Sequence, residues 1–220
     1  MSSKRAETSR IEPSASSALI VVDVQNSFVK GGALAVAHGE DVVPVINRLA
    51  PAFQNAILTQ DWHSPEHASF ASSHPGKQPF DTVDVAYGRQ ILWPDHCVQG
   101  TAGAALVADL HIPHAQLILR KGFHKEIDSY SAFMEADRRT PTGLEAYLRQ
   151  RGISTLFVGG LATDFCVAWT ALDARALGFD TYVIEDACRA IDLNGSLATA
   201  WTEMQSKGVK RIQSADIAIS

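Results

Sequence analysis

The sequence predicts a single α/β domain, a three-layer αβα sandwich around a mainly parallel sheet of about six strands. Three observations support this prediction. Short β-branched apolar runs alternate with segments of helical periodicity along most of the 220-residue chain. Strand–helix alternation with right-handed crossovers produces parallel strands covered on both faces. The length and the 46% hydrophobic content suit one globular domain.

Six segments carry strand signals. The first, ALIVVDV, is a β-branched run that ends near an acid, as expected of a buried parallel strand. The other five are similarly short and apolar. The predicted strands cover residues 18–24, 55–59, 116–120, 155–158, 181–185 and 209–213.

Four segments are predicted to be helices. Residues 41–53 have apolar groups at helical spacing, and residues 141–151 open with a Thr-Pro pair, an N-cap followed by proline at the first helical position. Residues 163–177 and 196–207 each end at a glycine, which commonly terminates a helix.

Two regions lack this alternation. Residues 1–16 are polar, without the apolar core of a signal peptide, and are predicted to be a flexible tail before a domain at 17–220. The cytoplasm is the expected compartment. Residues 61–113 are rich in His, Pro, Gly and Ser and are predicted to be a long functional loop.

Composition excludes several kinds of partner. The net charge is −5 and no basic tract occurs, so neither nucleic acid nor an anionic membrane is expected. No apolar run approaches the roughly 18 residues of a membrane span. The three cysteines are widely spaced and odd in number, which argues against a disulfide framework and leaves thiols for chemistry.

Three residues near predicted strand ends form a candidate catalytic set, because ligands of parallel sheets bind beyond the carboxyl ends of the strands. Cys166 follows Gly159-Gly160 at the start of a helix, where free N–H groups and the helix dipole favour thiolate. The alternative is a small buried hydrophobe. Asp23 could accept the thiol proton, and Lys121 could orient the acid. Alternatively, Asp23 only caps a helix and Lys121 is solvated.

A candidate metal site lies in the long loop. In Asp61-Trp62-His63, residues two apart on a strand end point to the same side, so both can bind one ion. His96 strengthens this reading, and His67 follows in the same loop. Carboxylate and imidazole ligands suit one divalent ion, zinc, iron or manganese, with an open coordination position.

These motifs together resemble the nicotinamidase branch of the isochorismatase-like cysteine hydrolases. The resemblance covers nearly the whole chain after the tail. Its six segments, in order, are VDVQNSF at 22–28, TQDWHSP at 59–65, WPDHCVQGT at 93–101, Lys121-Gly122, DSYSAF at 128–133 and GLATDFCV at 160–167. One departure is Ser27, where the family often has Asp; we expect altered local hydrogen bonding and retained activity.

The resemblance implies the isochorismatase-like hydrolase fold and a role for each site residue. Cys166 would attack nicotinamide, releasing ammonia and forming a thioester that water hydrolyses to nicotinate, in service of NAD salvage. Asp23 would shuttle the proton and Lys121 would assist it. The remaining implied roles are metal binding by Asp61, His63 and His96, with His67 as a candidate fourth ligand; substrate contacts by Phe28, Trp93 and Tyr130; and an oxyanion hole from the N–H groups of Ala162 and Cys166, after a cis peptide.

The resemblance also bears on cofactor and partners. The resemblance favours zinc as the ion and implies pyrazinamide as a second substrate. Whether the protein forms a homo-oligomer stays open. The competing hydrolases are isochorismatases and carbamoyl-group amidohydrolases, which share the Asp, Lys and Cys but generally lack both metal segments. A non-catalytic metal-binding or interaction protein on the same fold is the competing reading from another class.

Overall fold

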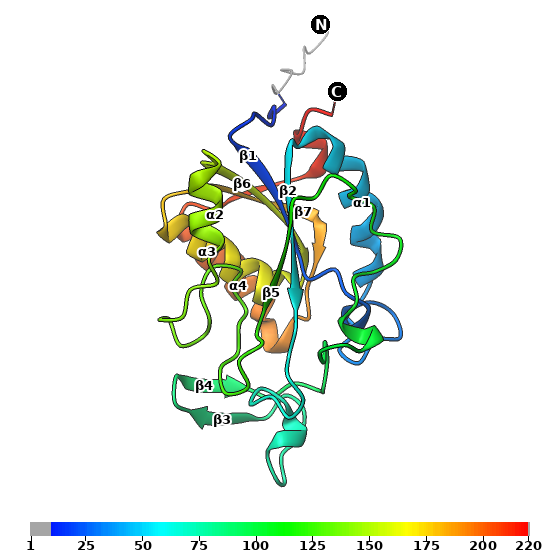
Figure 1. The fold of residues 1–220 in the computed structure, drawn as a ribbon, viewed down its shortest axis with the longest axis vertical. Helices are drawn as coiled ribbons and strands as arrows, with labels where there is room; N and C mark the ends of the chain where they lie inside the picture. Colours follow the sequence, from blue (N-terminus) through cyan, green and yellow to red (C-terminus); the bar gives the residue numbers. More distant parts are fainter. Residues whose placement is uncertain (1–9, 220) are drawn as a thin grey trace, which may run out of the picture.

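The computed structural model describes residues 10–219, and its centre is one parallel sheet (Figure 1). The strand order is β5-β2-β1-β6-β7-β8, and every neighbouring pair is parallel. The predicted six-stranded parallel sheet is therefore confirmed. The strands are β1 (Ser17–Val22), β2 (Asn55–Asp61), β5 (Leu117–Lys121), β6 (Thr155–Leu161), β7 (Asp180–Arg189) and β8 (Lys210–Ile212).

Helices cover both faces of this sheet. Helix α1 (Val42–Leu49) lies on one side, and α2 (Leu144–Gln150), α3 (Ala168–Ala176) and α4 (Ser196–Ser206) lie on the other (Figure 1). Side chains of β1 alternate between the two layers: Leu19 belongs to the α1 core and Ile20 to the core of the other three helices. A strand buried on both faces explains why its sequence is continuously apolar.

The region predicted as a long loop, 61–113, contains a hairpin that no periodicity indicated. Strands β3 (Thr82–Val85) and β4 (Gly88–Ile91) pair antiparallel, at the end of the molecule toward which β2 points (Figure 1). Single bridges, His63 with Val98 and Phe70 with Trp93, join distant parts of the region. These pairings hold the histidine-bearing segments against the end of the sheet.

Two predicted segments end or begin elsewhere. The strand predicted over 18–24 stops at Val22, because Asp23 adopts a positive φ of 47° that extended pairing does not allow. The helix predicted over 141–151 begins only at Leu144. Pro141 is bridged to Met134 instead, so the Thr-Pro signal belonged to a loop.

Two helices are also shorter than predicted. The segment 41–53 is helical only over α1, with 3₁₀ turns at Gly39–Asp41 and Ala50–Ala52. The segment 163–177 opens with a π-helical turn over Thr163–Val167, and the regular helix α3 follows.

The predicted tail over 1–16 lies partly outside the described residues, which begin at 10. Within them, the backbone N–H of Ile11 donates to the Asp216 carbonyl at 2.7 Å, and the Ala218 N–H donates to the Ile11 carbonyl at 2.9 Å. The tail prediction therefore fails for Ile11, which pairs with Ile217. Across residues 10–219, no helix has the length and apolarity to cross a membrane.

Candidate active site

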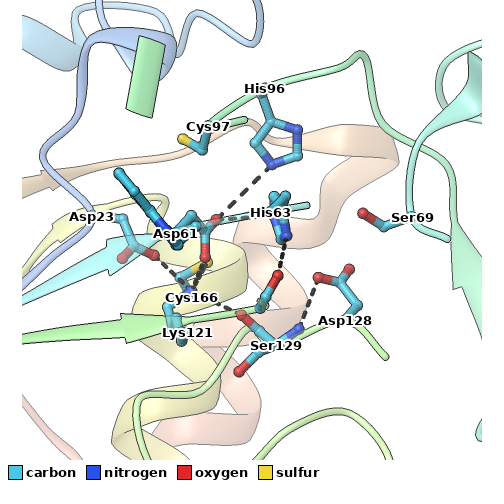
Figure 2. A network of polar contacts seen from close by, with 12 residues as sticks. Asp23, Asp61, His63, Ser69, His96, Cys97, Lys121, Asp128, Ser129 and Cys166 are labelled. Carbon is cyan, nitrogen blue, oxygen red and sulfur yellow. Dashed lines mark hydrogen bonds and ion pairs between the residues drawn. The ribbon is translucent and has the colours of Figure 1, made fainter. Parts of the chain in front are cut away.

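The three predicted catalytic side chains meet in one buried cluster (Figure 2). Lys121 Nζ lies 2.8 Å from Asp23 Oδ2 and 3.4 Å from Cys166 Sγ. The same ammonium donates to the Ser129 carbonyl at 2.8 Å and to Asp61 Oδ1. An ammonium has three hydrogens, and here carboxylate and carbonyl oxygens take them, so its orientation is fixed.

Neighbouring strand ends bring these side chains together. Asp23 follows β1, and its Oδ1 accepts a 2.6 Å hydrogen bond from the Thr59 hydroxyl on the adjacent β2. Lys121 is the last residue of β5 and pairs in register with Asp61 at the end of β2. Cys166 comes from the π-turn after β6, beyond a cis peptide between Leu161 and Ala162.

The electrostatics of the cluster correct one prediction. Burial raises the pKa of the Cys166 thiol well above its usual value, despite the nearby Lys121 ammonium. Burial therefore opposes the thiolate that the helix N-terminus and the ammonium favour. Burial also raises the pKa of Asp23, to about 6, against the opposing effect of Lys121. A carboxylate with a pKa nearer neutrality is a better acceptor for the thiol proton than an exposed aspartate.

Asp61, His63 and His96 converge beside this cluster (Figure 2). Asp61 Oδ2 lies 3.7 Å from His63 Nε2 and 3.9 Å from His96 Nε2. All three residues are buried. Lys121 and the His63 ring lower the pKa of the Asp61 carboxyl although burial alone would raise it. Asp61 is therefore a carboxylate that faces two imidazole nitrogens.

The two histidines are held in the tautomer that suits a metal ligand. His63 Nδ1 contacts the Gly122 carbonyl at 2.8 Å, and His96 Nδ1 contacts the Pro94 carbonyl at 2.8 Å. A carbonyl only accepts hydrogen bonds, so each Nδ1 carries a proton and Nε2 is the ring nitrogen left to face Asp61. This backbone support of the ring is typical of metal-binding histidines.

The charge of the cluster also fits a divalent cation. Two buried carboxylates, Asp23 and Asp61, contact the single ammonium of Lys121, and a third, Asp128, lies close to His63. These acids outnumber the one buried lysine of the site, and a divalent cation would offset the excess negative charge. Burying uncompensated charge is costly, so the donor set and its charge both suit one divalent ion.

The structure does not add His67 to this ligand set. His67 Nε2 contacts the carbonyl oxygens of His124 and Ile127 at 3.0 and 3.2 Å, so it carries the proton. His67 Nδ1 is 2.8 Å from the Ser69 hydroxyl. Both ring nitrogens are therefore engaged, and His67 packs its ring against His63 with centroids 4.3 Å apart.

The predicted substrate-contacting residues line one cavity next to the cysteine. Phe28, Trp93 and Tyr130 share it with Ala162 and Cys166, and Asp61, His63 and His96 also reach it. Its free volume is about 20 Å³, room for about one water. An aromatic ligand would therefore have to move these side chains apart.

Sequence reasoning missed four other residues of this cavity: Leu34, Asp128, Phe165 and Ile191. Asp128 and Phe165 stood inside recognised motifs, which was the only available signal for them. Leu34 and Ile191 lie in irregular segments far apart in the sequence, and no pattern indicated that they would meet.

Ser27, the departure from the family pattern, has a clear structural role. Its Oγ accepts a 3.0 Å hydrogen bond from the backbone N–H of Cys97, next to His96. A Cβ at Gly103 would lie 2.6 Å from the same oxygen, so little space remains for a larger side chain at position 27. Ser27 is thus hydrogen-bonded to the segment that carries His96, and the expected difference from an Asp at this position stays a prediction.

A buried Asp–Lys–Cys cluster at the carboxyl edge of a parallel sheet, beside a two-histidine carboxylate group, defines a cysteine-hydrolase type of site. Residues 17–216 of the chain also match the sequence model of the isochorismatase domain family. The chain therefore belongs to the isochorismatase family, in its nicotinamidase branch, and is a hydrolase acting on an amide C–N bond.

The similar proteins support this membership over their full lengths. The nicotinamidase of Acinetobacter baylyi is 59% identical over 210 residues, covering 96% of this chain and 98% of its own. The solved nicotinamidase/pyrazinamidase of Acinetobacter baumanii is 64% identical with a TM-score of 0.92, covering 92% of this chain and 98% of its own.

Two other solved structures contain bound groups. The L. infantum protein PnC1, in complex with nicotinate, has a TM-score of 0.84 at 36% identity and covers 96% of this chain and 100% of its own. The Pyrococcus horikoshii pyrazinamidase, in complex with zinc, has a TM-score of 0.73 at 34% identity and covers 90% and 99%.

Proposed function

We propose that this protein hydrolyses nicotinamide to nicotinate and ammonia, and so serves NAD salvage. The observation that carries the proposal is the shared cavity. The Cys166 thiol and the Asp61–His63–His96 group line the same small space, closed by aromatic side chains. With its aromatic walls moved apart, this space would admit a flat nitrogen heterocycle whose carboxamide reaches the thiol.

Acylation would start from the neutral thiol. Asp23 takes the proton from Cys166, whose sulfur then attacks the carboxamide carbon, while Lys121 offsets the negative charge that develops. The C–N bond breaks and Asp23 returns the proton to the leaving nitrogen as ammonia departs. The acyl group stays on sulfur as a thioester.

Deacylation reverses these roles. Asp23 takes a proton from a water whose oxygen attacks the thioester carbon, the C–S bond breaks, and the sulfur recovers the proton as a thiol. In both steps we assign the developing oxyanion to the backbone N–H groups of Ala162 and Cys166, which line the cavity. The two half-reactions restore the enzyme and consume one water.

Asp61, His63 and His96 would hold one divalent ion, zinc being the first choice among zinc, iron and manganese. When bound, this ion offers the ring nitrogen of the substrate a Lewis-acid contact. Phe28, Trp93 and Tyr130 would pack on the ring and exclude water. Pyrazinamide, which also has a ring nitrogen, is a second proposed substrate.

The direct test is ammonia release from nicotinamide, pyrazinamide, benzamide and a carbamoyl compound, with and without chelator. We expect rapid release from the two ring-nitrogen amides, slow release from benzamide, and loss of activity after chelation that added metal restores. Cleavage of the carbamoyl compound with nicotinamide untouched would instead support the carbamoyl-amidohydrolase alternative and overturn the substrate assignment.

A further inference from the structure

The β3–β4 hairpin contributes a buried glutamine to the wall of the substrate cavity. Gln90 on β4 is 2% exposed, and its amide nitrogen lies 3.1 Å from the Tyr130 hydroxyl and 2.9 Å from Asp128 Oδ2. Both of these partners line the cavity. Gln90 itself stands one layer behind them.

The Tyr130 hydroxyl also accepts a hydrogen bond from the indole N–H of Trp93. Trp93 Nε1 donates to the Tyr130 hydroxyl at 2.9 Å, and the two rings meet edge to face with centroids 6.4 Å apart. An indole N–H only donates, so Tyr130 must serve as its acceptor. The orientation of two cavity aromatics therefore depends on where the Tyr130 hydroxyl is held.

Gln90 is in turn fixed by its own partners. Its Oε1 accepts a 3.0 Å hydrogen bond from the Tyr87 hydroxyl, and its Nε2 also donates to the Ile91 carbonyl at 2.6 Å. Tyr87 accepts the backbone N–H of Asp128 at 3.2 Å. The two amide hydrogens thus serve three oxygens, so two of these oxygens share one hydrogen. Both polar side-chain atoms of Gln90 are therefore hydrogen-bonded.

We propose that Gln90 is a positioning residue that holds the Trp93–Tyr130 wall and thereby sets how tightly the cavity binds an aromatic ring. It acts through Tyr130 and does not touch the reacting atoms. The part of this inference that concerns ring binding rests on the proposed function. The part that concerns the position of Trp93 depends only on the hydrogen bonds from Gln90 and Trp93 to the Tyr130 hydroxyl.

Two variants of nearly the same size separate hydrogen bonding from shape. Gln90→Met removes both the donor and the acceptor. Gln90→Glu keeps the oxygen that Tyr87 contacts but places a second oxygen against Asp128 and Tyr130, where a donor is needed. The matched control is Gln116→Leu, because the Gln116 amide is also hydrogen-bonded but stands beside Ala56, at the opposite end of the sheet.

The kinetic readout is the split between KM and kcat for nicotinamide, with bound metal measured in each protein. We expect KM to rise about tenfold in Gln90→Met, the effect of one lost hydrogen bond, and further in Gln90→Glu. The kcat and the metal content should stay near those of the Gln116→Leu control. Unchanged KM in both variants, or a loss of metal or kcat instead, would overturn the proposal.

A second readout does not depend on turnover. The indole N–H signal of Trp93, assigned with Trp93→Phe in ¹⁵N-labelled protein, should shift and exchange faster with solvent in both Gln90 variants. If the unaltered enzyme leaves nicotinamide intact, the proposed function fails and this signal alone decides the role of Gln90. An unmoved Trp93 signal in folded Gln90 variants would refute it.

Discussion

Asp23 Oδ2 lies 2.8 Å from Lys121 Nζ, and neither side chain has any exposed surface. The two charges come from strands on opposite sides of β2, so the pair exists only when the sheet is assembled. The two carboxylates that Lys121 contacts, Asp23 and Asp61, raise the pKa of the ammonium although burial alone would lower it. The pair therefore links the stability of the sheet edge to the chemistry of Cys166.

Replacing Lys121 with Met should destabilise the protein by about 3–5 kcal/mol, since it leaves two buried carboxylates without their cation. Urea unfolding measures the change. The control is Lys125→Met, whose exposed ammonium pairs with the exposed Glu66 and should cost less than about 1 kcal/mol. Equal stability of the two variants would mean that the buried pair contributes nothing.

Cys166→Ala should abolish ammonia release while the protein stays folded, because no other described side chain in the cavity carries a thiol. Cys188→Ala, also a buried cysteine, should keep activity and serves as the control. Mass spectrometry of acid-quenched enzyme should detect the acyl adduct in the Cys188 variant and not in the Cys166 variant. Normal turnover by Cys166→Ala would remove this residue from the mechanism.

The acidic limb of kcat/KM should reflect Asp23. Burial raises the pKa of Asp23 to about 6, and only the ionised form can take the thiol proton. Activity should therefore be lost as pH falls through about 6, decreasing roughly tenfold for each further pH unit. A limb centred on 3.8, the ordinary value for aspartate, would show that the base is not a buried Asp23.

His96→Ala should lose both bound metal and activity, because it removes one of the two imidazoles that face Asp61. His67→Ala is the contrasting variant. Both nitrogens of His67 are engaged by other groups, so its loss should lower the unfolding temperature but leave metal bound. The metal content of each purified variant shows which histidine is a ligand. A metal-free His67→Ala variant would mean that His67 also binds the ion.

Gly122→Ala should impair metal binding although it replaces none of the proposed ligands. A Cβ at this position would lie 2.6 Å from His63 Cε1 and 2.8 Å from His63 Nδ1, so the ring must shift. Gly76→Ala is matched for backbone cost, since both glycines have positive φ, but Gly76 has open space around its Cβ position. Comparable metal affinity in the two variants would show that the His63 ring is not held where the structure places it.

The sequence alone determined the sheet and the chemistry-bearing residue types. Continuous apolar runs such as ALIVVDV identify strands buried on both faces, because only that environment excludes polar side chains from successive positions. The same patterns placed Asp23 and Lys121 near strand ends. Since parallel strands end at one edge, their convergence with Cys166 was predictable, and the resemblance supplied the candidate roles.

Tertiary structure decided what local patterns cannot encode. The Thr-Pro signal at 140–141 was wrong because Pro141 is bridged to Met134 within the same irregular segment, before the helix begins. The thiolate expected at Cys166 is disfavoured because burial outweighs a helix N-terminus and a nearby ammonium. His67 resembles a ligand in sequence, yet two carbonyls and a hydroxyl occupy its ring nitrogens. Burial and many hydrogen-bond partners, such as the His124 and Ile127 carbonyls at His67, come from other segments of the chain, so only the folded structure determines them.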